Sequence, residues 1–269
     1  MNEKTAKKYL QKTKKIEGWF SIHDVISFAS ILKIQEDLMI PGSLLEIGVY
    51  QGKSALLIGS YSKSAEDFEV CDIFGLESDV ENKHEISSSY RNLNREIFEN
   101  NFLNNLGALP VIHECKSIDL SNKLHSNSYR FIHIDGSHLY SHVVHDVQLA
   151  LDVLTHEDGV IVMDDFRSQH TIGVSLAIWE KIIESEFRPF LVTPAKMYLS
   201  KKLSEINLEK VSDALNVNGV KTVYENLGDF QIIRTLDLPD GEVYKVRNLR
   251  SEIIPPAILK IIRKITSSF

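Results

Sequence analysis

A chain of 269 residues, 43% hydrophobic and 25% charged, has the composition of an ordinary globular protein and is long enough to bury a substantial core. The formal net charge of −7 argues against a general nucleic-acid binder, which carries a basic footprint, and favours a small-molecule or glycan substrate. No stretch has the composition of a disordered or transmembrane segment.

The N-terminal lysines and the cysteines bear on the location of the protein. Six lysines lie within the first 15 residues without an apolar segment behind them, so this stretch is not a secretory signal. We expect the solvated face of a helix; contact with an acidic partner or a membrane surface is the alternative. Cys71 and Cys115 are too few for a disulfide framework and fit a reducing compartment, so we expect a cytoplasmic protein.

The segment 44–54 reads Leu-Leu-Glu-Ile-Gly-Val-Tyr-Gln-Gly-Lys-Ser and predicts a short buried strand, a glycine turn and the start of a helix. A dinucleotide fingerprint would read G-x-G-x-x-G, and the first glycine of a P-loop lies five residues before the second. Here Gly48 lies only four residues before Gly52. Both glycines would let backbone approach a ligand closely, and Glu46 favours a ligand with a positive charge.

Strand and helix patterns alternate over the middle of the chain, which predicts a mainly parallel sheet. Strands are expected at 68–72, 110–115, 129–135 and 160–166, and helices at 21–39, 54–62, 90–106, 141–154 and 172–184. Ser21 and Asp24 form a capping pattern for the first helix. The polar stretch 77–89 is expected to form a lid or substrate loop. In the helix 141–154, the spacing predicts four buried side chains, namely Val144, Val147, Leu151 and Leu154.

The last third of the chain has a different pattern. The segments 190–193 and 196–199 are expected to form two strands, and 203–215 a short helix. A hairpin is expected between 230–236 and 242–246. The basic apolar helix 258–265 would pack onto the domain or a second subunit in a homo-oligomer; a membrane surface is the alternative.

Four aspartates end predicted strands. In a Rossmann-like sheet, Asp72 at the end of the second strand could accept hydrogen bonds from ribose hydroxyls, and a cap for a turn is the alternative. Asp135 ends the fourth strand, and Asp164 and Asp165 end the neighbouring fifth. Their oxygens could reach one hard cation such as Mg²⁺, which would relieve the repulsion between them. The alternative is that the last two cap the next loop.

These segments resemble a known family. Glu46-x-Gly48-x-x-x-Gly52 resembles motif I of the class I S-adenosylmethionine-dependent methyltransferases. Three further motifs, Gly18-Trp19-Phe20, Asp135-Gly136-Ser137-His138 and Asp164-Asp165, resemble the branch of metal-dependent sugar and macrolide O-methyltransferases. The resemblance covers roughly residues 19–200. It implies a Rossmann-like, doubly wound α/β fold with a mainly parallel sheet and an antiparallel edge hairpin, followed by a small C-terminal α+β extension.

The resemblance also implies a site. Glu46, Gly48 and Gly52, with Tyr50 and Ser54, would line the methionine side of an S-adenosylmethionine pocket. Asp72 would contact the ribose, Ser117 the adenine edge, and Asp135 the cofactor as well; a turn cap is the alternative for Ser117. The metal ligands would be Asp135, Asp164 and Asp165.

His138 is the candidate general base, on the loop after the fourth strand. Some relatives carry a second acid where this chain has Ser137, so an imidazole would replace a carboxylate. A metal-ligand or plain loop role for His138 is the alternative. A zinc site with His142 and His145 is the less favoured interpretation. His170 is a weaker substrate-facing candidate, and His133 in its strand should be a satisfied core histidine.

Together these features predict a methyltransferase that acts on a hydroxyl of a sugar or similar polyhydroxylated acceptor with a divalent cation; a nitrogen acceptor stays open. The competing hypothesis is a noncatalytic scaffold that kept the fold. Gathered carboxylates favour catalysis, because a scaffold has no physical need of them. The expected organisation is a helical segment at 1–40, the methyltransferase domain at 41–200 and the extension at 201–269.

Overall fold

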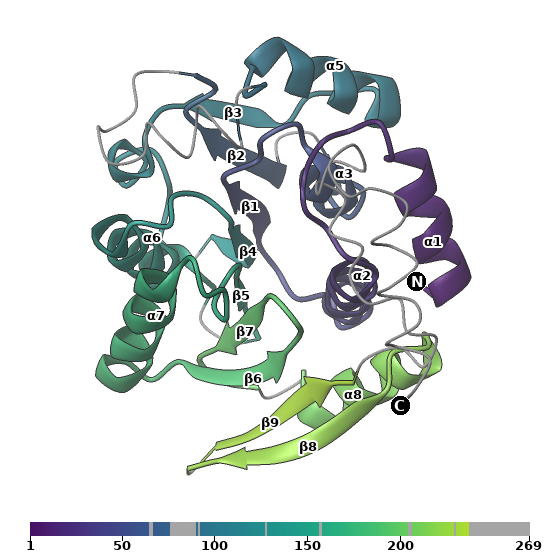
Figure 1. Cartoon of the computed structure of the whole chain (residues 1–269), viewed down its shortest axis with the longest axis vertical. Helices are drawn as coiled ribbons and strands as arrows, with labels where there is room; N and C mark the ends of the chain where they lie inside the picture. The colour runs from purple at the N-terminus through teal and green to yellow at the C-terminus, as the bar shows by residue number, and fades with distance from the viewer. Residues whose placement is uncertain are drawn as a thin grey trace, which may run out of the picture. The chain divides into compact units, whose positions relative to one another are not determined.

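The computed structural model describes residues 1–64, 67–75, 90, 92–126, 128–155, 158–203, 206–228 and 230–236. Residues 1–236 form one compact unit (Figure 1), and the predicted lid at 77–89, the strand at 242–246 and the helix at 258–265 lie outside the described residues. No helix in the described part is long and apolar enough to cross a membrane. The elements in chain order are α1 (Glu3–Lys12), α2 (Ile22–Asp37), β1 (Ser43–Ile47), α3 (Lys53–Gly59), β2 (Phe68–Asp72), α5 (Arg95–Leu106), β3 (Val111–Glu114), the 3₁₀ helix η3 (Ser117–Asp119), β4 (Tyr129–Ile134), α6 (Tyr140–Val153), β5 (Val160–Met163), α7 (Ile172–Glu184), β6 (Arg188–Val192), β7 (Met197–Ser200), α8 (Leu208–Val217), β8 (Thr222–Leu227) and β9 (Phe230–Thr235).

One mixed sheet forms the centre of this unit, with strand order β3-β2-β1-β4-β5-β7-β6-β9-β8 (Figure 1). The first five strands in this order are parallel. The chain runs outward from β1 to β3, then returns to place β4 on the other side of β1. This reversal is the switch point at which α/β sheets bind ligands, outside the carboxyl ends of the strands. The predicted Rossmann-like, mainly parallel fold is confirmed.

Alternating strand residues build two apolar cores, one on each face of the sheet. Leu44, Phe131 and Val162 contribute to the core that α2 and α3 cover. Leu45, Ile132 and Met163 contribute to the core that α6 and α7 cover. Because helices cover both faces of the sheet, every residue of β4 is buried, including the polar Arg130 and His133. Glu46 of β1 is also buried, and Glu46 and His133 both lie on the α2 face because of their register with these residues.

The start of α2 is the predicted capping box. The Ser21 side chain accepts from the backbone N–H of Asp24, and the Asp24 side chain accepts from the backbone N–H of Ser21. The helix begins and ends within two residues of its predicted bounds. It is buried on nearly all sides because α1, α3 and α8 pack around it. The capping box thus fixes a helix whose side chains reach the polar centre of the sheet.

The later elements differ from the prediction. The antiparallel pair β6 and β7 does not form the edge of the sheet, because β9 pairs with β6 and β8 pairs with β9. Among the described residues β9 forms its hairpin with β8, and the predicted partner 242–246 lies outside them. Gly228, which has a φ of +60°, lies in the short turn that joins β8 and β9. This turn is a weaker signal in the sequence than Pro239-Asp240-Gly241, on which the prediction rested.

The apolar face of α6 is rotated from its predicted position. Val147 and Leu154 are buried as predicted, but Val144 and Leu151 are only partly buried. The strongly buried positions begin instead at Val143, and they include an acid, Asp146. The helix is covered by both α7 and η3, so its buried face is wider than a single stripe at helical spacing.

Candidate functional site

The glycine turn after β1 packs directly against the residues that follow β4. Gly48 has a φ of +84°, and a Cβ there would lie 2.1 Å from the backbone oxygen of Asp135. The backbone N–H of Asp135 in turn donates to the carbonyl of Ile47 at 2.8 Å. Gly48 is therefore required by the contact between the two loops, and not only by the approach of a ligand.

Asp72 holds this turn in shape. Its carboxylate accepts hydrogen bonds from the backbone N–H groups of Val49 at 2.8 Å, Tyr50 at 2.9 Å and Phe74 at 3.0 Å. Tyr50 and Phe74 have φ values of +47° and +44°, a strained conformation that these bonds hold in place. Burial raises the pKa of Asp72, although these N–H donors oppose the shift. The capping alternative therefore describes Asp72 in this structure, and its contact with a ribose stays a prediction.

Glu46 is fully buried at the base of the turn. Its Oε1 accepts from Ser54 Oγ at 2.5 Å and lies 2.7 Å from His133 Nδ1. Its Oε2 is also buried and has no hydrogen-bond partner among the described residues. Burial raises the pKa of Glu46 to about 8. A buried carboxylate oxygen without a donor can bind a cationic group, which would supply both a hydrogen bond and a balancing positive charge.

His133 links Glu46 to a buried lysine that the sequence analysis missed. His133 Nε2 lies 3.2 Å from Lys196 Nζ, and Lys196 Nζ lies 2.5 Å from Asp164 Oδ2. Burial and the charge of Lys196 hold the pKa of His133 well below its ordinary value, so the ring is neutral. Because the ammonium can only donate, Nε2 must accept and Nδ1 must carry the proton that it donates to Glu46. His133 is thus the satisfied core histidine that was predicted, with both nitrogens engaged.

The register of two antiparallel strands places the lysine opposite the aspartate. Met163 of β5 pairs with Met197 of β7, so the residue after β5, Asp164, faces the residue before β7, Lys196. Burial alone would lower the pKa of Lys196, but the carboxylates of Asp164 and Asp135 raise it above its ordinary value. The lysine is therefore charged, and it neutralises the acid beside it.

The three acids predicted as metal ligands are divided in this structure. Asp135 and Asp164, together with His133, present potential ligand atoms within 4.8 Å of one another. Burial and the neighbouring charge of Asp164 raise the pKa of Asp135 well above its ordinary value. Asp165 has a φ of +52°, and its carboxylate Oδ2 lies 3.0 Å from His138 Nε2. The pair of Asp165 and His138 was not foreseen, and a carboxylate at this distance favours the charged imidazolium that a general base becomes when it accepts a proton.

A divalent ion does not fit beside Asp164 while Lys196 holds its present position. One oxygen of Asp164 binds Lys196, and the other accepts from the backbone N–H of Asp165 at 2.8 Å. Two charges about 4 Å from an ammonium would be repelled by about 8 kcal/mol at an effective dielectric constant of about 20. The set of Asp135, Asp164 and Asp165 as ligands of one ion remains a prediction, and it requires Lys196 to leave first.

Ser117 lies at the start of η3, beside the end of β3. Its side chain hydrogen-bonds to Asp146, a buried acid of α6 whose pKa burial raises to about 7. A Cβ added at Gly136 would lie 3.8 Å from Asp146 Oδ2, so this acid lies under the loop after β4. Asp146 was also missed by the sequence analysis, although an acid between Val143 and Val147 breaks an otherwise apolar face and could have indicated it.

The remaining histidines are not gathered around one point. His142 Nδ1 lies 2.9 Å from Ser137 Oγ, and His145 Nε2 lies 3.3 Å from the backbone oxygen of Ser117. His170 is exposed. Within the described ranges, the one group of three potential metal ligands is that of His133, Asp135 and Asp164, so the zinc interpretation has no support there.

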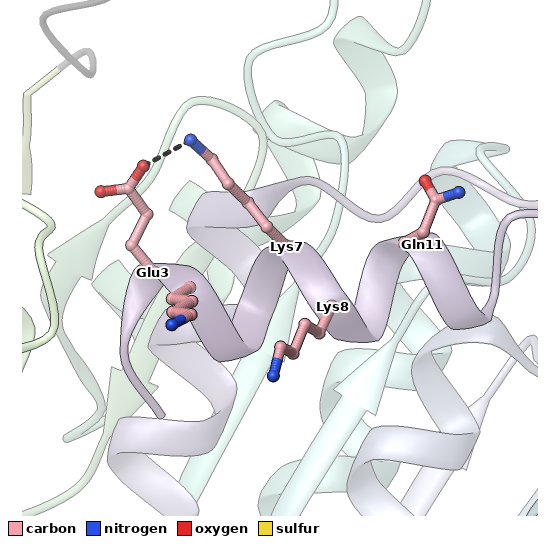
Figure 2. A pocket seen from close by; sticks show the side chains of 5 residues that line it. Glu3, Lys7, Lys8 and Gln11 are labelled. Atoms are coloured by element: carbon pink, nitrogen blue, oxygen red, sulfur yellow. Dashed lines mark ion pairs between the residues drawn. The ribbon is translucent and has the colours of Figure 1, made fainter.

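A surface hollow of about 470 Å³ lies away from these residues, on α1. Figure 2 shows its lining, with Lys7 paired to Glu3 at 2.7 Å and with Lys8 and Gln11 projecting from the same helix. All of its lining residues are on α1, and none was predicted to be in the site. The hollow fits the solvated lysine face that was expected of this segment, and the polar centre of the sheet remains the candidate site.

Known proteins share this architecture. Residues 45–166 match the model of a family described as a methyltransferase domain. The O-methyltransferase NovP superposes with a TM-score of 0.56 at 15% identity, over 68% of this chain and 81% of that one. A putative O-methyltransferase from Klebsiella pneumoniae gives 0.51 at 13%, over 72% and 88%. The cofactor-bound Rv0187 from MTB gives 0.50 at 12%, over 74% and 90%. No curated protein matches the sequence.

The fold, the glycine turn and this match define the class of the central segment: residues 45–166 form a methyltransferase domain with a Rossmann-like sheet. More particularly, the matched segment runs from β1 to the loop after β5 and includes Glu46, Asp72 and the acids at 135, 164 and 165. The domain that the comparison identifies is thus the part of the chain that carries the candidate site.

Proposed function

We propose that this protein transfers the methyl group of S-adenosylmethionine to a hydroxyl of a sugar or similar polyhydroxylated small molecule in the cytoplasm. One observation carries the proposal. A carboxylate oxygen without a hydrogen-bond partner and an imidazole beside a carboxylate lie toward the carboxyl ends of neighbouring strands. The first belongs to Glu46 in β1, and the second to His138 and Asp165 after β4 and β5. These three strands are direct neighbours. One group would bind the methyl donor, and the other would activate the acceptor.

The donor pocket is proposed to lie around the glycine turn. Glu46 Oε2 would accept from the cationic amino group of the methionine part, and Ser54 would hold the carboxylate through Oε1. Asp72 would keep the turn in the shape that the donor needs, whether or not it also reaches the ribose. The other proposed contacts are those of the turn, of the adenine edge and of the loop after β4, namely Gly48, Tyr50, Gly52, Ser117 and Asp135.

The proposed transfer needs a base for the acceptor hydroxyl. When bound, S-adenosylmethionine supplies a methyl group attached to a sulfonium sulfur. The sulfur leaves as a neutral thioether when the methyl group is transferred. His138 would take the hydroxyl proton as the acceptor oxygen forms its bond to the methyl carbon and the bond from sulfur breaks. Asp165 would orient the imidazole and stabilise its positive charge after proton transfer. Such assistance is typically worth about 10²–10⁴-fold in rate.

The divalent cation that the sequence predicts has no part in the proposed steps. The ligands proposed for it are Asp135, Asp164 and Asp165, and the contact between Lys196 and Asp164 opposes it. The steps assigned to Glu46 and His138 do not depend on the ion.

An aromatic group supports a cyclic acceptor such as a sugar. Trp19 is 57% exposed, with its ring centroid 6.2 Å from that of Tyr50 and 5.4 Å from that of Tyr90. Glu17 accepts from the Tyr50 hydroxyl at 2.5 Å and from the Asn92 side chain at 3.0 Å. An exposed indole beside fixed polar groups can pack on the apolar face of a sugar ring while its hydroxyls are bound.

The test is methyl transfer from isotope-labelled S-adenosylmethionine to a panel of matched sugars, polyols and amines. We expect label in hydroxylated compounds and its loss in His138→Gln. Label in amines alone would overturn the choice of oxygen as the acceptor atom. Donor binding without transfer to any compound, unchanged by the Trp19→Ala and His138→Gln substitutions, would favour the noncatalytic alternative.

A further inference from the structure

Lys196 is the only lysine among the described residues that is buried. Its side chain is 1% exposed, and its ammonium contacts Asp164 Oδ2 at 2.5 Å and His133 Nε2 at 3.2 Å. It also lies 5.9 Å from the centroid of the Phe28 ring, a cation–π distance. A buried ammonium is costly unless it is paired, so its position at the acidic cluster must be maintained by these contacts.

The backbone holds this lysine in place. The Lys196 N–H donates to Thr193 Oγ1 at 3.1 Å, and the Thr193 N–H donates to the Lys196 carbonyl at 2.9 Å, which closes the turn between β6 and β7. The Thr193 hydroxyl also donates to Asp24 of α2 at 3.3 Å. The lysine is thus fixed at both ends, by a closed turn at its backbone and by an ion pair at its ammonium.

We propose that the Lys196 ammonium is the resident cation of the Asp135–Asp164 cluster, and that it fills the position for which a divalent ion was predicted. Both oxygens of Asp164 are occupied in this arrangement, one by the ammonium and one by a backbone N–H. Both nitrogens of His133 are occupied as well. With Asp164 and His133 occupied, Asp135 alone offers too few protein ligands for a divalent ion, and the site functions without a divalent metal.

Lys196 acts as a positioning residue. It binds Asp164 on one side and, through neutral His133, fixes the carboxylate of Glu46 on the other. The same side chain thus connects the two parts of the site. Its consequence for methyl transfer rests on the proposed function, whereas its consequence for metal binding does not.

The test measures the binding of Mn²⁺ to chelator-treated protein by electron paramagnetic resonance. Wild type is expected to bind no Mn²⁺ at this cluster. Lys196→Met, similar in length but uncharged, frees Asp164 and is expected to bind Mn²⁺ at least tenfold more tightly. Lys196→Arg keeps the charge and is the matched control. Adding Asp164→Asn to Lys196→Met should abolish the gain.

Wild-type Mn²⁺ binding that Asp164→Asn removes would overturn the proposal, and so would a Lys196→Met variant that folds and gains no binding. If wild type and Asp164→Asn bind Mn²⁺ equally, the ion is bound outside the Asp135–Asp164 cluster, as the proposal requires. If Lys196→Met does not fold, the comparison of wild type with Asp164→Asn alone decides. Calorimetric binding of S-adenosylmethionine is measured on the same samples, so that failure of the proposed function is recognised separately.

With an acceptor identified, a second measurement concerns the rate. The wild-type rate should be unchanged by a chelator, and added Mg²⁺ should not raise it. Lys196→Met should lower kcat at least tenfold, and Mg²⁺ should restore part of the loss in this variant alone. A wild-type rate that falls at least tenfold with a chelator and returns with Mg²⁺ would contradict the proposal.

Discussion

The two sides of the candidate site use aspartates in opposite ways. At the turn after β1, Asp72 accepts three backbone N–H groups, and all of its partners lie within 23 residues along the chain. After β5, Asp164 is neutralised by Lys196, which comes from a different strand. The first acid shapes the backbone of the glycine turn, whereas the second belongs to a network of side chains formed by Asp164, Lys196 and His133. Position at a strand end therefore does not define the role of an acid; its donors do.

Glu46 connects the two sides, because it bonds both to Ser54 of the turn and to His133 of the network. A change on one side should therefore affect the other through Glu46 and through the packing of the turn on Asp135. Substitutions on the two sides should have separable effects on rate, stability and donor binding.

The largest effect is expected at the proposed base. His138→Gln removes the proton acceptor and should lower kcat by about 10²–10⁴-fold, while the Kd for S-adenosylmethionine stays unchanged. Asp165→Asn should lower kcat less, because the imidazole remains. Steady-state kinetics and calorimetry measure the two quantities. The control is His113→Gln on β3, where the histidine pairs with Glu69. Equal losses of rate and donor affinity in His138→Gln would contradict the division of the site.

Loss of the turn anchor should reduce stability. Asp72→Ala leaves the N–H groups of Val49, Tyr50 and Phe74 without an acceptor, each at a cost of about 1–3 kcal/mol. The free energy of unfolding should fall by at least about 3 kcal/mol in a denaturant titration. Asp72→Asn keeps one acceptor oxygen and should lose less. The exposed Asp119→Ala serves as the control and should stay within about 0.5 kcal/mol of wild type. Wild-type stability in Asp72→Ala would refute the anchoring role.

Glu46 should couple donor binding to proton release. Its pKa of about 8 leaves it largely protonated near pH 7, and a cationic ligand would lower that pKa. Binding should therefore release close to one proton near pH 7 and almost none well above pH 8, as calorimetry in buffers of different ionisation enthalpy can measure.

Glu46→Gln should abolish this release and weaken donor binding by roughly 10–100-fold, the value of a charged hydrogen bond. Ser54→Ala, which removes only the Oε1 donor, is the matched control and should keep the release. Undiminished proton release by Glu46→Gln would assign it to another group.

The smallest effect is expected at the capping box of α2. Ser21→Ala removes the acceptor of the Asp24 N–H and should lower the free energy of unfolding by about 1 kcal/mol. Because the hydrogen bonds of Ser21 are to Asp24 of the same helix, the affinity for S-adenosylmethionine should not change. The exposed Ser121→Ala is the control for stability. A change in donor affinity with little change in stability would contradict this separation.

The sequence predicted the parts of the site that local patterns determine. The turn between β1 and α3, the capping box and the acids at the strand ends follow from spacing within a few residues. The parallel strands follow from their alternation with helices. His133 was correctly placed in the core because its neighbours Ile132 and Ile134 are apolar.

The network could not be predicted in the same way, because its contacts depend on register. Lys196 meets Asp164 only if β7 pairs antiparallel with β5 and Met197 faces Met163. A lysine before an apolar strand is usually exposed, so nothing nearby indicated its burial. Asp146 was missed for a related reason, since the buried face of α6 depends on α7 and η3. The spacing of residues along the sequence therefore could not indicate which side chains meet across strands.

The most direct test of the account is calorimetric titration of chelator-treated wild-type protein with S-adenosylmethionine, with and without added Mg²⁺. The proposed contact of Glu46 with S-adenosylmethionine needs no metal, so we predict equimolar binding with the same Kd in both conditions. No binding in either condition would contradict the donor site, and binding that appears only with Mg²⁺ would contradict the role of Lys196 as the resident cation.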